Sequence, residues 1–396
     1  MAEGDIGAII ESFDLKAGLP GTEIRGFDLI HFSGDVYVMA YHDKIAGVNH
    51  GRLATITIDS LGDIGAAPID ILEFWATLSF AMALIKISDT VVAVAYTNNT
   101  GRGVVTTVSV DGVGNLGAII DTLVFDLICG TGNQRNVIRH VSGDIYAIVR
   151  RGTDNDGYLV TVTIDSDGNI GAAVEDTLEF DGVDCDHPDL FHVAGEVYTI
   201  VYRGNAGVGT IITVSIDAAG TIGAIDSLQF DLAATQYLRV RPVSGEIYAI
   251  VYDELLRGYI DTLTIDAAGN IGAVIDTQEI SVANQGWGPS ILHVSGDVYL
   301  VVFSGDSGVG GDDFYAKTHP IDAAGNIGAN ISSLKLADSS IPTSEMPVVY
   351  VGGQVYAALY SGLTSAVLVT FPVETLLGGA PASGDVAHKL LMAAAI

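Results

Sequence analysis

Gly4-Asp5-Ile6-Gly7-Ala8 is the first of seven copies of one short turn in this chain of 396 residues. The other copies occupy residues 62–66, 114–118, 168–172, 220–224, 269–273 and 325–329. The second glycines of these turns are about 50 to 58 residues apart, which is the length of one four-stranded blade in repeat architectures. The sequence therefore predicts one structural unit that is repeated seven times.

The fourth repeat contains four segments that we expect to form strands, at residues 188–193, 196–202, 210–216 and 224–230. Gly195 separates the first two segments, and glycine there supplies the positive φ that a hairpin turn needs. The second segment is apolar on both faces, as expected of a covered strand, whereas the fourth segments carry acids that discourage pairing with another chain. This gradient predicts that the first strand lies at the axis and the fourth at the rim.

The two ends of the chain predict a closed ring. The last repeat supplies three segments, at 347–351, 354–360 and 366–371, and no fourth segment follows. Residues 7–15 match the fourth strands elsewhere but have no preceding three strands. A propeller gains closure when the first strand completes the last blade, whereas an open solenoid such as a parallel β-helix has no reason to split a repeat. We therefore expect an all-β, seven-bladed β-propeller with four antiparallel strands per blade over residues 1–377.

Composition narrows the classes of partner. The chain is 49% hydrophobic with 48 glycines, so it can bury a large core. The net charge of −31 argues against a nucleic-acid or anionic membrane surface, because phosphate binding needs clustered Lys and Arg. No stretch approaches the roughly 20 apolar residues of a membrane span. The start, residues 1–5, has neither a basic leader nor an apolar h-region, so we expect either that no classical signal exports the protein or that the sequence begins at the mature domain. The acidity serves either solubility and salt tolerance or the binding of cations or a basic partner.

A longer pattern surrounds the repeated turn, [Ser/Thr]-x-Asp-x-x-Gly-x-[Ile/Leu], as in residues 57–64 and 163–170. This pattern resembles a relaxed Asp-box of sialidase-type propellers, which lies at the same turn between the third and fourth strands. It lacks the terminal aromatic residue, carries one extra residue before the glycine, and has Pro320 in place of the hydroxyl residue in one copy. In that family the aspartate caps local N–H groups and the glycine reverses the chain. The resemblance supports the blade and not the activity.

The candidate binding face is the one on which the repeats disagree. The two short turns are alike in every repeat, whereas the other two connections vary and share the opposite face. Residues at the start of the blades on this face mix charges and aromatic rings, which suits a glycan, a peptide or another polar ligand. Simple packing at the start of each blade is the competing interpretation. The candidate ligand-binding residues are Arg25, Asp28, Phe80 with Met82, Arg135, Asn136, His187, Asp189, Tyr237, Arg239, Trp287 and Glu345.

A glycoside hydrolase of sialidase type is the alternative function. The resemblance implies three arginines on a substrate carboxylate, a Tyr/Glu nucleophile and an Asp acid, and several of the candidate residues have those types. However, Arg25-Gly26-Phe27 departs from the Arg-Ile-Pro start of that family. No nucleophile elbow, His-Glu-x-x-His motif or phosphate loop is present. Non-catalytic binding or a structural role is therefore the prediction, and no catalytic residue is assigned.

Signals for metals and thiols are weak. Residues 165–169 resemble half of a calcium loop but lack its distal Glu. No cofactor is expected apart from weak Ca²⁺ or Mg²⁺ binding by acids of the outer loops, namely Asp154, Asp156, Asp312 and Asp313. Asp253, Glu254 and Asp306 are further acids in these loops. Four histidines share one position before the first hairpin, which indicates packing (His31, His140, His192 and His293). Cys129 and Cys185 are either free thiols or, in an extracellular protein, a disulfide.

The C-terminal segment changes character. Residues 378–385 have the composition of a flexible linker, and residues 386–396 form a short apolar tail. The tail either frays or docks on a neighbouring subunit in a surface layer, virion or filament. The expected partners are thus a protein or glycan at the variable loop face, or further copies of the chain through the tail. The acidic, Ala- and Gly-rich composition favours an extracellular or particle-surface setting.

Overall fold

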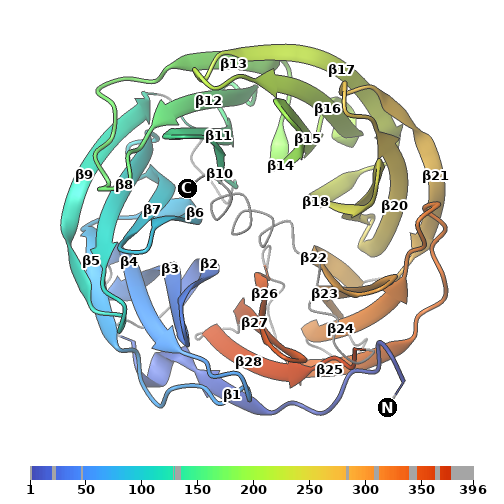
Figure 1. Cartoon of the computed structure of the whole chain (residues 1–396), viewed down its shortest axis with the longest axis horizontal. Helices are drawn as coiled ribbons and strands as arrows, with labels where there is room; N and C mark the ends of the chain where they lie inside the picture. The colour runs from blue at the N-terminus through green and yellow to red at the C-terminus, as the bar shows by residue number, and fades with distance from the viewer. Residues whose placement is uncertain are drawn as a thin grey trace.

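The computed structural model describes residues 2–19, 24–45, 48–127, 129, 135–281, 285–306, 312–338, 346–361 and 366–375. Over these residues the chain forms seven blades of four antiparallel strands around one axis (Figure 1). The described residues contain no α-helix, only the short 3-10 turns η1 (Leu15–Ala17) and η2 (Asn205–Gly207). No helix in this part of the chain could therefore cross a membrane. The predicted seven-bladed β-propeller is confirmed.

Each blade follows the same order from axis to rim. The first blade contains β2 (Ile24–Ser33), β3 (Val36–Ile45), β4 (Val48–Thr57) and β5 (Asp70–Trp75). The second blade contains β6 (Ser79–Ser88), β7 (Val91–Asn98), β8 (Gly103–Val110) and β9 (Leu116–Asp126), and the third contains β10 (Val137–Ser142), β11 (Ile145–Arg151), β12 (Gly157–Thr163) and β13 (Asp176–Asp181). The fourth contains β14 (Asp186–Ala194), β15 (Val197–Arg203), β16 (Gly209–Ile216) and β17 (Ile222–Asp231), and the fifth contains β18 (Thr235–Ser244), β19 (Ile247–Glu254), β20 (Arg257–Ile265) and β21 (Ile271–Glu279). The sixth contains β22 (Gln285–Ser295), β23 (Val298–Asp306), β24 (Asp312–Pro320) and β25 (Ser332–Asp338). The seventh contains β26 (Val348–Gly352), β27 (Val355–Ser361), β28 (Ala366–Pro372) and β1 (Glu11–Asp14).

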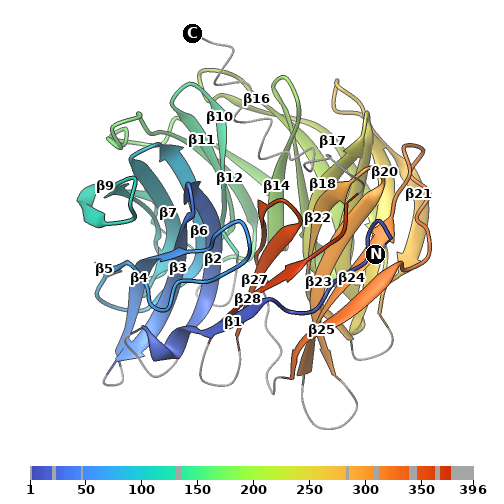
Figure 2. The same ribbon diagram turned by 60° about the horizontal axis from the view of Figure 1, so that its bottom comes forward.

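The ring closes as predicted. Strand β1 pairs antiparallel with β28, from Glu11 opposite Thr370 to Asp14 opposite Val367, and runs along its outer side (Figure 2). The strand is shorter than the predicted residues 7–15. Beyond Thr370 on β28 lies Pro372, whose carbonyl accepts the Gly7 N–H at 3.0 Å but which has no N–H to donate to the ladder. The first strand of the chain therefore completes the last blade.

A ring of seven hydrogen bonds joins each blade to the next. In every blade a buried threonine of the third strand donates its hydroxyl to the carbonyl of the turn glycine in the following blade, at 2.5–2.7 Å. These glycines have φ between +84° and +95°, a conformation that residues with a Cβ rarely adopt. The pairs are Thr55–Gly114, Thr107–Gly168, Thr161–Gly220, Thr213–Gly269, Thr262–Gly325, Thr318–Gly4 and Thr370–Gly62.

The acids of the fourth strands form a second ring of contacts. Asp176 accepts the N–H of Ile222 at 2.8 Å, and Asp276 accepts that of Ile327 at 2.8 Å, each in the next blade. Asp70, Asp121 and Asp226 do the same, and Glu11 and Ser332 take this role where the chain ends meet. The sequence pattern indicates that these acids protect an exposed edge from pairing with another chain. That interpretation is incomplete, because a carboxylate directed at the neighbouring turn satisfies one of its N–H groups.

The turn aspartates are structural, as the resemblance implied. Asp165 accepts the N–H groups of Asp167 and Asn169 through Oδ1, at 3.0 and 2.8 Å, and the Asn169 amide through Oδ2 at 2.7 Å. Both of its oxygens are thus occupied within the turn. The aspartates at 59, 111, 217, 266 and 322 accept the same pair of N–H groups. The half calcium loop is one copy of this shared turn.

The repeated histidines and the two cysteines have contacts that fit a role in packing the fold. Nε2 of each of the four histidines donates to the carbonyl of the hairpin glycine three residues later, at 2.7–2.9 Å, which confirms a packing role. Cys129 and Cys185 are both buried free thiols, so they are not joined in a disulfide. Burial raises the pKa of Cys129 to about 12, and this thiol is therefore protonated at neutral pH.

We expect Thr107→Val to lower the free energy of unfolding by about 1–3 kcal/mol, because it leaves the buried Gly168 carbonyl without its donor. Urea unfolding followed by circular dichroism measures the change. Thr177→Val, at an exposed position on β13, is the matched control and should change stability by less than about 0.5 kcal/mol. Equal effects of the two substitutions would show that the threonine ring contributes little.

Candidate functional site at the axis

A bulge recurs where the first strand of a blade reaches the axis. The pairing with the second strand shifts register at this point in β2, β6, β14, β18 and β22. The residue within the shift has a left-handed backbone in all five cases, with φ between +49° and +62°. A bulge of this kind bends the strand and redirects the side chains that follow it. The residues are Gly26, Ala81, His187, Tyr237 and Gly288.

One residue of each blade lies at an equivalent point beside the axis, six positions before the hairpin glycine or its counterpart, and in five blades it follows this bulge. In the first, fourth and fifth blades these residues are charged, namely Asp28, Asp189 and Arg239. Their backbone partners are equivalent as well, Ala40, Val201 and Val251 on the second strands. The remaining blades contribute Ala83, Val137, Ser290 and Pro347.

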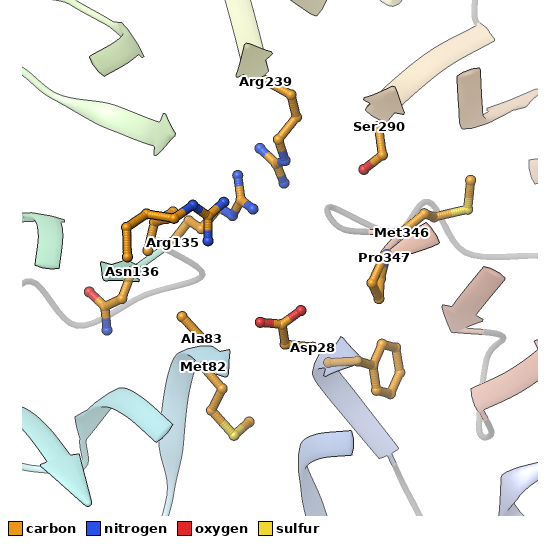
Figure 3. A pocket seen from close by; sticks show the side chains of 12 residues that line it. Asp28, Met82, Ala83, Arg135, Asn136, Arg239, Ser290, Met346 and Pro347 are labelled. Atoms are coloured by element: carbon orange, nitrogen blue, oxygen red, sulfur yellow. The ribbon is translucent and has the colours of Figure 1, made fainter. Parts of the chain in front are cut away.

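A pocket of about 380 Å³, part of it open to solvent, lies among these residues. Its polar lining comes from Asp28, Arg135, Asn136, Arg139, Arg239 and Ser290. Figure 3 shows Arg135 and Arg239 directed toward the same central space that the Asp28 carboxyl and the Ser290 hydroxyl face. The apolar lining comes mainly from the first, second and seventh repeats, with Phe27, Met82, Ala83, Met346 and Pro347, and Val137 joins it from the third. Cationic and apolar walls thus face one another across a small space.

Asp189 anchors the arginines. Its carboxylate is fully buried and lies 2.8 Å from Arg241 Nη1, 3.1 Å from Arg135 Nη1 and 3.8 Å from Arg139 Nη2. It also accepts the Val240 N–H at 3.2 Å. Burial alone would raise the pKa of Asp189, but the arginines outweigh it and hold the pKa well below its usual range. One ionised carboxylate therefore supports several guanidinium groups at the axis.

Asp28 has a different environment. It accepts the N–H groups of Leu29 at 2.9 Å and of Leu84, in the next blade, at 2.8 Å. Burial raises its pKa above the usual value although these N–H groups and the charges of Arg135 and Arg139 act in the opposite direction. The two acids of the axis therefore differ, because Asp189 lies directly against the arginines and Asp28 lies opposite them.

Three aromatic rings lie in consecutive blades beside this pocket. The ring centroids of His187 and Tyr237 are 4.1 Å apart, and those of Tyr237 and Trp287 are 6.3 Å apart with an interplanar angle of 29°. Burial and the charges of Arg239, Arg203 and Arg135 together lower the pKa of His187 to about 4, against the opposing effect of Asp186. The imidazole is therefore neutral at pH 7.

The structure brings some of the predicted residues together and separates others. Asp28, Arg135, Asn136 and Arg239 line the pocket, as does Met82, and Asp189 supports them. Phe80 contacts His42 instead, with ring centroids 6.4 Å apart, and Arg25 is exposed on β2 outside the pocket lining. Glu345 lies outside the described residues.

Sequence reasoning missed Arg139 and Arg241. Both occupy the position four residues before the first hairpin glycine, two after the axial residue of the same strand. Aligning the repeats at the hairpin glycine would have flagged them, because the other blades carry apolar residues there.

The loop acids are largely committed to other partners. Asp154 accepts the Tyr158 hydroxyl at 3.0 Å, and Asp313 lies 2.9 Å from Lys335 Nζ. Burial raises the pKa of Asp253 to about 7, which disfavours the ionised form that a cation needs. Asp156 is partly exposed near Asp154, and the Asp306 and Asp312 side chains lie outside the described part of the chain. Among the described residues no three His, Cys, Asp or Glu side chains gather at a possible metal site, and Ca²⁺ binding stays a prediction.

Comparisons with known proteins support the fold. No family model and no curated protein matches the chain. Among solved structures, the periplasmic gluconolactonase of Pseudomonas aeruginosa is 14% identical with a TM-score of 0.55, covering 89% of this chain and 100% of that one. A candidate 6-phosphogluconolactonase from Bacteroides uniformis is 14% identical with a TM-score of 0.57, covering 82% and 89%. Sqt1 from Chaetomium thermophilum, bound to the N-terminus of a ribosomal protein, is 10% identical with a TM-score of 0.50, covering 89% and 97%.

At these identities the likeness shows the propeller fold alone. None of the three is a sialidase. The resemblance of the turns therefore holds for the propeller scaffold, while a sialidase-type relationship has no support.

Replacing the anchor tests the axial network. We expect Asp189→Asn to lower the free energy of unfolding by about 3–5 kcal/mol at pH 7, because it leaves buried arginine charge uncompensated. The folded-state pKa of Asp189 is depressed, so its contribution is complete above the unfolded value near 4 and is lost as pH falls through the lower folded value. Urea unfolding between pH 3.5 and 8 should show a difference that shrinks below about pH 4. Asp167→Asn, on an exposed turn, is the control, and a similarly small effect at both sites would contradict the anchoring role.

Proposed function

We propose that this chain is a non-catalytic binding propeller that holds the anionic group of a polar ligand in its axial pocket. The observation that carries the proposal is the set of three pocket-lining arginines, Arg135, Arg139 and Arg239, arranged around one buried carboxylate. Guanidinium groups match carboxylate and phosphate oxygens in geometry and charge, and they stay protonated at every physiological pH.

The charge distribution supports an anion in an otherwise acidic protein. The chain has 11 arginines, and four of them (Arg135, Arg139, Arg239 and Arg241) influence Asp189. These guanidinium groups gather at the axis of a chain whose net charge is −31, so a ligand anion would meet local positive charge in the pocket.

Binding is favoured over catalysis by the chemistry of the lining. Arginines do not exchange protons at neutral pH, and His187 belongs to the aromatic row and not to the pocket lining. Tyr237, which the sialidase alternative would use as a nucleophile, lies between His187, at an interplanar angle of 58°, and Trp287, on which it stacks. Solved propellers of similar fold include both a lactonase and a protein bound to a peptide, so the fold is compatible with either type of function.

Small anions test this proposal. We expect acetate and inorganic phosphate to bind the full chain at low ionic strength, with heat measurable by isothermal titration calorimetry. Arg135→Gln should weaken binding at least about tenfold, or 1.4 kcal/mol, and Arg135→Lys should lie between it and the unchanged protein. Arg102→Gln, at an exposed arginine outside the pocket, is the charge-matched control and should bind normally. No binding to the unchanged protein, or equal loss in Arg102→Gln, would overturn the proposal.

Self-assembly through residues 378–396 and an extracellular or particle-surface setting are separate proposals, and these residues lie outside the described part of the chain. If the apolar tail joins subunits, the full chain should have a multiple of its 41.2 kDa mass in light scattering, and a chain ending at Gly379 should be monomeric. Two monomers would exclude assembly through the tail.

A further inference from the structure

We infer that the axial site recognises the C-terminal residue of a peptide, with the free carboxylate between the arginines and an apolar last side chain against the opposite wall. This inference rests on the proposed function and names its ligand. It follows from the lining of the pocket, which is cationic on one side and, apart from the Asp28 carboxyl, mainly apolar on the other.

The cationic wall provides for one carboxylate. Arg135 comes from the third blade and Arg239 from the fifth, and Figure 3 shows both directed toward the centre of the pocket. Asp189 fixes Arg135 at 3.1 Å, and the Leu238 carbonyl accepts from Arg239 Nη1 at 2.8 Å. Side chains held in this way lose little further freedom when a ligand arrives, which favours specific recognition.

The apolar residues of the pocket are the part that would contact the last side chain of the peptide. Met82 and Met346 are two of the five methionines in the chain, and both line this pocket together with Phe27. Methionine is flexible and polarizable, and it is common at surfaces that accept varied peptide side chains. Met82 and Met346 are almost fully buried, so a ligand side chain would meet only the part of each that faces the pocket.

The dimensions of the pocket favour a terminal residue over an internal acid. The pocket is a small space that is partly open to solvent, so charged and apolar groups of the ligand must lie close together. In a C-terminal residue the carboxylate and the side chain share one carbon atom. In aspartate or glutamate the carboxylate is itself the side chain, and no apolar group accompanies it.

The aromatic row provides a surface for the preceding residues. Tyr237 and Trp287 are partly exposed beside the pocket, and Tyr237 is two residues from Arg239 on the same strand. Tyr237 and His187 hold left-handed backbones, with φ of 55° and 49°, at a position where other blades use glycine or alanine. Bulky residues adopt this conformation at a cost of about 1 kcal/mol or more, and such strain is concentrated at functional sites.

The test is a titration of short peptides that differ only at their C-terminus. We expect acetyl-Gly-Ala-Leu with a free carboxylate to bind at least about tenfold more tightly than the same peptide ending in an amide. It should also bind at least about fivefold more tightly than acetyl-Gly-Ala-Gly with a free carboxylate. Arg135→Gln should abolish the preference for the acid over the amide, while Arg102→Gln should retain it.

A second variant examines the apolar wall. Met82→Ala enlarges the space beside the ligand and should shift the preference from a C-terminal leucine toward a C-terminal phenylalanine. If this variant does not fold, the leucine-to-glycine comparison in the unchanged protein tests the same wall. The ratio of affinities is measured by calorimetry with the full chain.

The outcomes separate this inference from the proposed function. Binding of acetate and phosphate without any gain from the leucine peptide would leave an anion site and overturn the C-terminal assignment. A peptide with an internal glutamate and an amidated end that binds as well as the leucine acid would also overturn it, as would tighter binding of glucuronate. If neither the small anions nor the peptides bind, the proposed function itself is wrong.

Discussion

The hydrogen bond between a third-strand threonine and the left-handed glycine of the next turn is the contact on which the rest of this propeller depends. It occurs in all seven blades, and the pairs Thr318–Gly4 and Thr370–Gly62 carry it across the junction of the chain ends. The glycine carbonyl can face the threonine only because the backbone has positive φ at that point. A Cβ there would also meet the neighbouring isoleucine in most turns, for example within 2.8 Å at Gly62. The glycine in the sequence, the positive φ of the turn and the packing of one blade on the next therefore depend on one another.

Much of the fold could be predicted because its determinants are local. A glycine at a turn of positive φ is visible in the sequence, and seven such turns at nearly constant spacing define seven blades. Charged axial residues such as Asp28, Asp189 and Arg239 could be found as well, since each lies six positions before the hairpin glycine of its blade. The role of Asp176 was not apparent, because the N–H that it accepts belongs to Ile222, 46 residues away in another blade.

The candidate site was only partly predictable for a similar reason. Arg241 and Arg139 reach Asp189 from the fifth and third blades, so their convergence depends on long side chains that cross between repeats. Phe80 shares the start of a first strand with the other candidates, but its ring contacts His42. A residue's position in the repeat sets where its Cα lies. The bulge and the length of the side chain then decide whether it enters the axis.

The contrast between surface and axis limits which anions can use this site. A net charge of −31 repels anions at distances within the Debye length, about 8 Å at physiological ionic strength, whereas the arginines act by contact. Long polyanions would place most of their charge against the acidic exterior, while a ligand with one carboxylate places its only charge among the guanidinium groups. Added salt screens the long-range repulsion and the local attraction together, so affinity for such a ligand should depend less on salt than binding to a basic surface does. For the ligand that we propose, the acidic exterior would thus leave recognition to the short-range geometry around Asp189.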